Sequence, residues 1–362
     1  MVTVAVDAGG ADLGPREVAA GASRAAAHGT RVLLFGPAKE IGRVHEGVEV
    51  VDAPVSIAKQ VDPAHAVRTT PEASIVQATR AVAEGRAQAF VSGGSTGSAL
   101  AAALLHLRRD RGVYRPALAL PLPNPDGPPI LLLDVGANAT CRPEHLVQFA
   151  HMGSAFAQAV IGIPTPRVAL LSNGEEPGKG TPDLVGVHEQ LAGSRGAGLN
   201  FIGNIEGTQV FGGVADVVVM DGFTGNITLK LIEGVSGRAL RLVGEMAATT
   251  PRGRLGARLI APTMRRLRET IDPEGPGGAY MLGLRHLGVV AHGRFSARGF
   301  AQAIDVAARG VQHDVIGRTR AALLEAGALR PPRLGSVPVD DPDGPTGEPG
   351  GSSAPAATVS TS

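Results

Sequence analysis

The sequence lacks several features that mark common classes of protein. It has no tryptophan and only two tyrosines, so it offers few platforms on which nucleic-acid bases could stack. Its 34 lysines and arginines nearly balance 33 aspartates and glutamates, which argues against a nucleic-acid partner. The single cysteine, Cys141, excludes an internal disulfide framework and fits a reducing cytoplasm.

Long apolar runs and metal-binding patterns are missing as well. No run of apolar residues reaches the length of a membrane span, and residues 1–7 are typical of a short strand rather than a signal peptide. No His-Glu-x-x-His motif occurs, and His145 and His151 are off a common helix face, so we expect no metal site. Cys141 has no Cys-x-x-Cys partner and is interpreted as a structural thiol. A cytoplasmic protein is therefore expected.

What the sequence contains is an alternation of apolar, often β-branched runs with amphipathic stretches. The expected strands are residues 2–6, 31–35, 87–91, 130–133, 167–171, 199–202 and 216–219, and the expected helices are 16–27, 74–83, 98–107, 145–160 and 225–246. This alternation predicts an α/β fold with a mostly parallel sheet covered by helices on both faces. We expect one folded region over residues 1–330. Residues 331–362, rich in Pro, Gly and Ser, are expected to be disordered.

Glycine-rich turns follow four of the expected strands, at the sheet edge where parallel sheets form their binding sites. The turn after residues 216–219 opens into a helix, so its backbone N–H groups and the helix dipole favour an anion. We expect the four turns to share one phosphate-binding site. Its residues are Asp7, Gly10, Gly94, Ser95, Thr96, Gly97, Asp134, Asn138, Asp221, Gly222 and Gly225. Of these, Asp7, Asp134 and Asn138 are expected to shape the turns rather than to react.

Residues 174–181 resemble a Walker loop but depart from it. The glycines lie one residue too close together, and Gly180 stands where Ser or Thr must hold magnesium, so we reject a nucleotide site. Lys179 remains of interest as a cation held in a glycine-rich loop after a strand.

Residues 93–97 form a literal G-x-S-x-G between a strand and a helix, the context of a hydrolase nucleophile. Asp221 and His292 follow Ser95 in the order Ser, Asp, His. No His-Gly-Gly segment for an oxyanion hole precedes the motif, so a serine hydrolase is kept as a minor alternative.

Residues 252–271 form a basic segment with six arginines and one acid. Its apolar residues near one face include Leu255, Leu259, Ile260, Met264 and Leu267. Pro262 predicts a division into two short helices. Basic amphipathic helices lie on anionic membrane surfaces, whereas packing against the same chain or a second subunit explains the pattern equally well.

Taken together, these segments resemble the bacterial acyl-carrier-protein:phosphate acyltransferases of phospholipid synthesis. The likeness runs over residues 4–317 and is most specific in 133–138, 143–150, 201–207, 216–230 and 277–283. The resemblance implies a three-layer α/β/α sandwich related to phosphotransacetylases and isopropylmalate dehydrogenases. It also implies a homodimer, peripheral contact with the membrane, acyl carrier protein thioesters as acyl donors, and no cofactor.

By the same resemblance, Lys179 and Asn226 are the expected catalytic residues. Inorganic phosphate would attack the thioester and give an acyl phosphate, which would pass to a membrane glycerol-3-phosphate acyltransferase. Lys179 would supply a cation for the phosphate and the developing oxyanion, and Asn226 would donate a hydrogen bond from the helix N-terminus.

The chain departs from the family near Thr70 and Pro71, where a pair of lysines is common. If those lysines help to bind phosphate or the carrier protein, this chain relies on Arg68 and Arg80 instead. A second alternative therefore stays open, namely a catalytically weak relative that binds the carrier protein or the membrane without turnover.

Overall fold

The fold is described from a computed structural model that covers residues 1–124, 127–193, 198–270, 272 and 274–331, without the side chains of 266–270. Met1–Arg330 forms one compact unit. The tail that the sequence predicts to be disordered lies outside the described residues, apart from Pro331.

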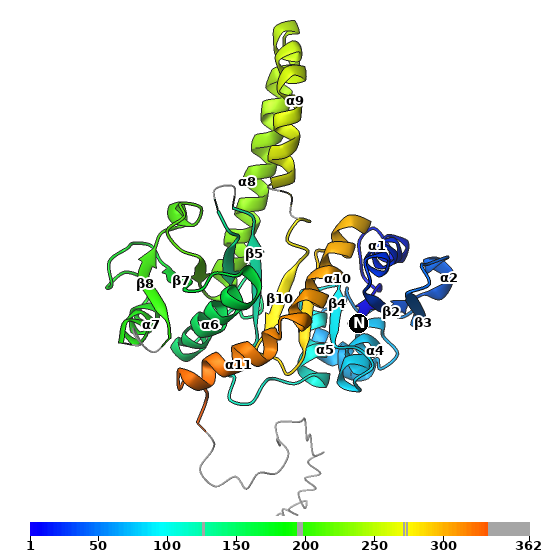
Figure 1. The fold of residues 1–362 in the computed structure, drawn as a ribbon, viewed down its shortest axis with the longest axis horizontal. Coiled ribbons are helices and arrows are strands. Elements are labelled where there is room, and N and C mark those ends of the chain that lie inside the picture. Colours follow the sequence, from blue (N-terminus) through cyan, green and yellow to red (C-terminus); the bar gives the residue numbers. More distant parts are fainter. Residues whose placement is uncertain (125–126, 194–197, 271, 273, 332–362) are drawn as a thin grey trace, which may run out of the picture. The chain divides into compact units, whose positions relative to one another are not determined.

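An 11-stranded sheet forms the centre of this unit, in the order β3-β2-β1-β4-β11-β10-β5-β6-β9-β7-β8 (Figure 1). The strands are β1 (Thr3–Asp7), β2 (Arg31–Gly36), β3 (Val48–Asp52), β4 (Ala89–Ser92), β5 (Ala117–Leu122), β6 (Ile130–Leu133), β7 (Arg167–Leu171), β8 (Asn200–Ile205), β9 (Val217–Val219), β10 (Ala279–Leu282) and β11 (Leu287–Val290). Most neighbours pair in parallel, but β5 and β10 run antiparallel to the strands beside them.

Helices cover both faces of the sheet. They are α1 (Pro15–Ala27), α2 (Ala38–Ile41), α3 (Pro63–Thr69), α4 (Ser74–Ala83), α5 (Thr96–His106), α6 (Pro143–Phe156), α7 (Pro182–Gly193), α8 (Gly222–Ala248), α9 (Pro251–Thr270), α10 (Ala297–Gln312) and α11 (Val315–Glu325). One apolar core lies under α1, α6, α7 and α10, and the other lies under α3, α4 and α5. The predicted α/β sandwich with a mostly parallel sheet is confirmed.

The strands β3, β5, β10 and β11 and the helices α2, α3, α7, α10 and α11 were not expected from the sequence. The unexpected strand β5 contains Pro121, which pairs with Leu131 of β6. Proline cannot donate to a strand ladder, so this segment does not carry the usual signal of a central strand.

The prediction that Pro262 divides the basic segment is wrong, because α9 is a single helix with Pro262 inside it. Pro262 is exposed. Proline removes only one backbone hydrogen bond within a helix, and at an exposed position water can bind the carbonyl that is left free.

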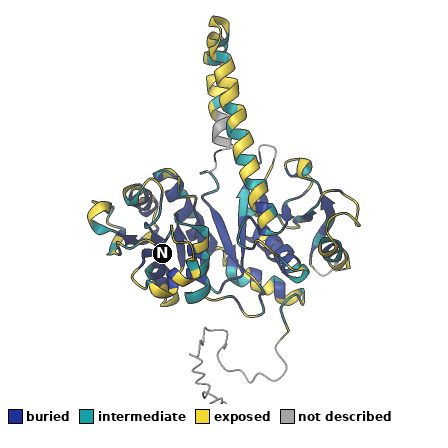
Figure 2. Ribbon diagram, turned by 180° about the vertical axis from the view of Figure 1, so that it is seen from behind, coloured by how far each residue is buried: buried dark blue, intermediate teal, exposed yellow. Residues whose placement is uncertain are grey.

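The helices α8 and α9 pack along each other and extend beyond the sheet (Figures 1 and 2). Much of this hairpin is exposed, and the exposed side chains include large apolar ones: Phe223, Ile227, Leu231, Val235, Leu242, Val243, Met246, Leu255, Leu259 and Ile260. No helix in the described residues is long and apolar enough to span a bilayer.

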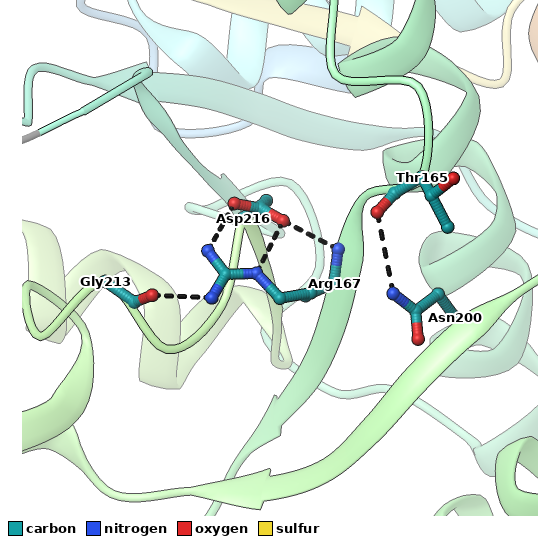
Figure 3. A network of polar contacts seen from close by, with 5 residues as sticks. All are labelled: Thr165, Arg167, Asn200, Gly213 and Asp216. Atoms are coloured by element: carbon teal, nitrogen blue, oxygen red, sulfur yellow. Dashed lines mark hydrogen bonds and ion pairs between the residues drawn. The ribbon is translucent and has the colours of Figure 1, made fainter.

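An ion pair fixes the start of two strands that lead into the candidate site. The guanidinium of Arg167 on β7 donates from Nε and Nη2 to the two carboxylate oxygens of Asp216, at 3.0 and 2.8 Å, just before β9 (Figure 3). Partial burial raises the pKa of Asp216, but the hydrogen bonds and charge of Arg167 more than offset this and hold the pKa below its usual value. The pair ties β7 to β9, whose carboxyl ends carry Lys179 and Asp221.

Candidate active site

The four glycine-rich turns lie at strand ends, but their direct contacts fall into two clusters rather than one. The turns after β1 and β4 form the first cluster, and those after β6 and β9 form the second. In the sheet, β11, β10 and β5 stand between β4 and β6. Direct contacts thus divide the four turns into two clusters, and the expectation that they share one phosphate-binding site stays a prediction.

In the first cluster the buried carboxylate of Asp7 is fully engaged by its own protein. It accepts hydrogen bonds from the Gly9 N–H at 2.9 Å, the Ser74 hydroxyl at 2.6 Å and the Ser92 hydroxyl at 2.7 Å. Burial raises the pKa of Asp7, and these donors oppose the rise. Gly10 and Gly94 lie against each other here, since a Cβ on Gly10 would come 3.2 Å from the Gly94 Cα. These hydrogen bonds hold Asp7 within the turn after β1.

The Ser95 side chain caps helix α5. Its side chain accepts from the Ser98 N–H at 3.1 Å and donates to the Ser98 hydroxyl at 2.9 Å. Asp221 accepts from Thr224 in the second cluster, and His292 Nδ1 accepts from the Arg294 N–H. No hydrogen bond joins the three residues within the described ranges, so the structure does not show the Ser-His-Asp arrangement that a serine hydrolase needs. Thr96 and Gly97 open the same helix.

In the second cluster the Asp134 carboxylate occupies the centre of its own turn. It accepts from the backbone N–H groups of Leu118, Gly136, Ala137 and Asn138, all at 2.8–3.1 Å. The Asn138 side-chain amide also donates to it, at 2.8 Å. Burial raises the pKa of Asp134 while these donors lower it. The N–H groups that could have held an external anion are thus taken by a protein carboxylate, and Asp134 and Asn138 shape the turn.

The start of α8 is likewise mostly satisfied internally. Asp221 accepts from the Thr224 N–H, and its carbonyl accepts from the Gly225 N–H, both at 2.9 Å. The Gly222 N–H donates to the Asn138 carbonyl at 2.8 Å. Among the N–H groups of this first turn in the described structure, that of Phe223 has no partner. The helix N-terminus therefore offers fewer free donors than the sequence suggested, although its dipole remains.

Gly222 and Gly225 let α8 lie directly on the turn after β6. A Cβ on Gly225 would come within van der Waals overlap of the Asp134 carbonyl, and one on Gly222 would lie 2.7 Å from the Asn138 carbonyl oxygen. Asn226 follows on the same helix, with its side chain 3.5 Å from the position of a Cβ on Gly136. The glycines thus set where the Asn226 amide stands relative to this turn.

A pocket of about 460 Å³ opens beside Asn226. Its lining residues are Gly136, Ala139, Gly222, Phe223, Asn226, Ile227, Lys230 and Leu231. Phe223, Ile227 and Leu231 recur every fourth residue and form an apolar wall that is 45–61% exposed. An amide and a cation beside an apolar wall suit a ligand with a polar head and an aliphatic chain.

Sequence reasoning missed Lys230 and the apolar wall. The signal was available, because Lys230 follows Asn226 by one helical turn and the apolar residues repeat at helical spacing. The spacing predicts a helix but does not show whether its apolar side chains are buried, and in the structure Phe223, Ile227 and Leu231 are exposed. In this structure Lys230 donates to Glu233 at 2.7 Å.

Lys179 lies in the loop after β7, next to the turn after β9 in the sheet. It is exposed, and its aliphatic stem lies so close to Gly174 that a Cβ there would come 2.7 Å from the Lys179 Cγ. Within the part of the chain that the structure describes, no carboxylate pairs with its ammonium. A cation without a partner at the carboxyl edge of the sheet is available to an anion.

Cys141 lies beside this cluster, with its Sγ 4.0 Å from the Asn138 carbonyl. Burial, together with the nearby charge of Asp134, raises the pKa of its thiol to about 12. Since the thiolate is the reactive form, we expect iodoacetamide at pH 8 to alkylate folded protein on the order of a thousandfold more slowly than protein unfolded in guanidinium. Mass spectrometry measures both rates, and equal rates would contradict the assignment of a structural thiol.

The fatty acid synthesis protein family matches residues 2–318. A phosphate acyltransferase of Moorella thermoacetica is 43% identical over 320 residues, covering 86% of this chain and 93% of that protein. A phosphate acyltransferase of Heliobacterium modesticaldum is 43% identical over 322 residues, with coverage of 86% and 95%.

Solved structures resemble the fold at low sequence identity. A phosphotransacetylase from Streptococcus pyogenes superposes with a TM-score of 0.59 at 16% identity, covering 86% of this chain and 94% of that one. The EutD phosphotransacetylase from Staphylococcus aureus gives a TM-score of 0.56 at 17% identity, with coverage of 85% and 93%. At these identities the likeness concerns the fold alone.

Proposed function

The chain belongs to the fatty acid synthesis protein family that includes the phosphate acyltransferases, and on this premise we propose that it transfers a fatty acyl group from acyl carrier protein to inorganic phosphate. The single observation that carries this proposal is the pocket at the start of α8. There the Asn226 amide and Lys230 stand at an exposed apolar wall, with the Lys179 loop on a neighbouring strand.

The reaction is a displacement at the thioester carbonyl. A phosphate oxygen attacks the carbonyl carbon, a C–O bond forms, and the tetrahedral oxyanion collapses as the C–S bond breaks. The carrier leaves as a thiolate, whose conjugate acid has a pKa of roughly 8.5, and takes up a proton from water. Phosphate needs little help from a general base, so the protein contributes orientation and stabilisation of negative charge.

In this proposal two groups supply that stabilisation. The Lys179 ammonium binds phosphate and the developing oxyanion, because no protein carboxylate competes for it in the described chain. The Asn226 side-chain amide donates to the same charge from the first turns of α8. The apolar wall at Phe223, Ile227 and Leu231 holds the first part of the acyl chain.

We further propose that the exposed hairpin α8–α9 brings the enzyme to the membrane surface, where acyl phosphate passes to a glycerol-3-phosphate acyltransferase. Leu255, Leu259 and Ile260 are 47–75% exposed. Exposed arginines 252, 254, 258 and 265 lie on the same helix. Apolar and cationic side chains together bind anionic bilayers. The same arginines suit an acidic carrier protein, and a homodimer remains part of the proposal.

Leu259→Glu is expected to reduce flotation of the protein with phosphatidylglycerol liposomes by about tenfold, because it removes apolar area that the bilayer would bury and adds repulsion from the anionic lipid. Val61→Glu is the matched control, since Val61 is fully exposed in a loop before α3. If liposome binding changed neither with the anionic lipid content nor with Leu259→Glu, a role of the hairpin at the membrane would be refuted.

The experiment that tests the function is an assay with palmitoyl-acyl carrier protein, scoring free thiol with and without phosphate. We expect thiol release that depends on phosphate, together with an acyl phosphate that hydroxylamine traps as a hydroxamate. Release without phosphate would instead indicate a hydrolase. Binding of the carrier without release would indicate an inactive relative.

A further inference from the structure

The loop that carries Lys179 is held by a hydrogen bond from a buried side chain on β8, the strand beside β7 in the sheet. Asn204 of β8 is 7% exposed, and its Nδ2 donates to the Glu176 carbonyl at 3.0 Å. The Lys179 N–H donates to the same carbonyl, also at 3.0 Å. One carbonyl thus links the lysine backbone to Asn204. A second tether, from Gln209 to the Glu175 carboxylate at 3.1 Å, is exposed.

A histidine fixes the orientation of the Asn204 amide. His188 of α7 is 7% exposed, and its Nδ1 lies 3.0 Å from Asn204 Oδ1. Because an amide oxygen only accepts, Nδ1 carries the proton, and Nδ2 of Asn204 is left to face Glu176. The imidazole also packs edge-on against Phe201, with ring centroids 5.2 Å apart.

A β-bulge makes this arrangement possible. Val168 pairs with Phe201, but the next residue of β7, Ala169, pairs with Gly203, so Ile202 is an extra residue in β8. Gly203 has φ +112°, a conformation that side chains rarely adopt. The extra residue places Phe201 and Asn204 on the same face, toward α7, although regular alternation would put them on opposite faces.

We propose that Asn204, oriented by His188, is a positioning residue that holds the Lys179 loop in its working conformation. This inference rests on the proposed function, in which Lys179 binds phosphate. Asn204 acts through the backbone of the loop and does not touch the reacting atoms. Misplacing a charged group by even one ångström costs a large part of its effect on a transition state.

Asn204→Asp tests the proposal, because it keeps the size of the side chain and the acceptor for His188 but removes the donor to Glu176. We expect kcat/KM for phosphate to fall about tenfold and the Lys179 amide to lose protection from hydrogen exchange. Asn200→Asp is the matched control on the same strand. Its amide donates to the Thr165 carbonyl at 3.5 Å, at the other end of β8 (Figure 3), and we expect no change at Lys179.

Two further variants guard against a simple folding defect. His188→Phe keeps the ring packing on Phe201 but removes the donor, and is expected to lower kcat/KM in the same direction. His188→Asn restores an amide donor near Nδ1 and is expected to recover most of the loss. In a Lys179→Ala background, Asn204→Asp is expected to cause no additional loss, because the group that it positions is gone.

The proposal would be overturned if Asn204→Asp changed neither the hydrogen exchange of the Lys179 amide nor turnover. It would also be overturned if Asn204→Asp lowered kcat/KM equally in the wild-type and Lys179→Ala backgrounds. If the unmodified protein releases no thiol in response to phosphate, the proposed function fails. The tether itself would still be supported if Asn204→Asp exposed the Lys179 amide to exchange.

Discussion

Lys179→Ala is expected to lower turnover at least about a hundredfold, since one donor to a developing oxyanion is typically worth 10²–10³ in kcat. The stability cost should be small, because the Lys179 side chain is exposed and makes no hydrogen bond or ion pair in the described structure. A residue with little structural role and a large catalytic effect is the signature of a functional cation. Asn226→Ala is expected to act in the same direction.

The measurement is steady-state thiol release at saturating acyl donor, with phosphate varied. Lys39→Ala on α2 is the control, since Lys39 is also exposed but follows β2, near the edge of the sheet opposite to β7. Lys179→Arg, which keeps the charge but not the compact ammonium, is expected to retain part of the activity. Near-normal turnover in Lys179→Ala would remove this residue from the chemistry.

Gly225→Ala is the second change with a large expected effect. The added methyl group would overlap the Asp134 carbonyl, so α8 must move away from the turn after β6. Overpacking of this kind costs about 1–3 kcal/mol of stability. Because Asn226 is the next residue, the same shift would also misplace its amide, and we expect turnover to fall at least about a hundredfold.

Gly234→Ala provides the matched control on the same helix. A Cβ at Gly234 meets no other atom within 4 Å, so the change should be neutral or should stabilise the helix by up to about 1 kcal/mol. Thermal unfolding and thiol release are measured on both variants. The comparison distinguishes the effect of the methyl group's overlap with Asp134 from the gain in helix propensity that both alanine substitutions share. Equal behaviour of the two alanine variants would mean that the close approach of α8 to the Asp134 turn is unimportant.

The strands with continuous β-branched or leucine-rich runs were predictable from the sequence. Residues 130–133 and 167–171 have the bounds observed for β6 and β7. In contrast, β5 pairs with β6 and also with β10, which lies far along the chain, and Pro121 conceals its strand character. Local composition does not encode pairing between segments that are far apart in the chain, so hydrophobic periodicity does not predict such strands.

The candidate site was predictable only in part, for the same reason. The glycine turns were expected at strand ends, and they lie there. Their division into two clusters follows from β11, β10 and β5 lying between β4 and β6, and strand order is a property of the whole fold. The sequence indicated that Asp134 shapes its turn, but not that its carboxylate would take the N–H groups expected to hold an anion, since which acceptor an N–H group finds is decided by packing.

The most direct measurement of the central claim is the fate of oxygen-18-labelled phosphate supplied with palmitoyl-acyl carrier protein. If a phosphate oxygen attacks the acyl carbonyl, ³¹P nuclear magnetic resonance will show an acyl phosphate that retains all the labelled oxygens, including the one that bridges carbon and phosphorus. Free palmitate with oxygen from water, and no labelled acyl phosphate, would contradict the account.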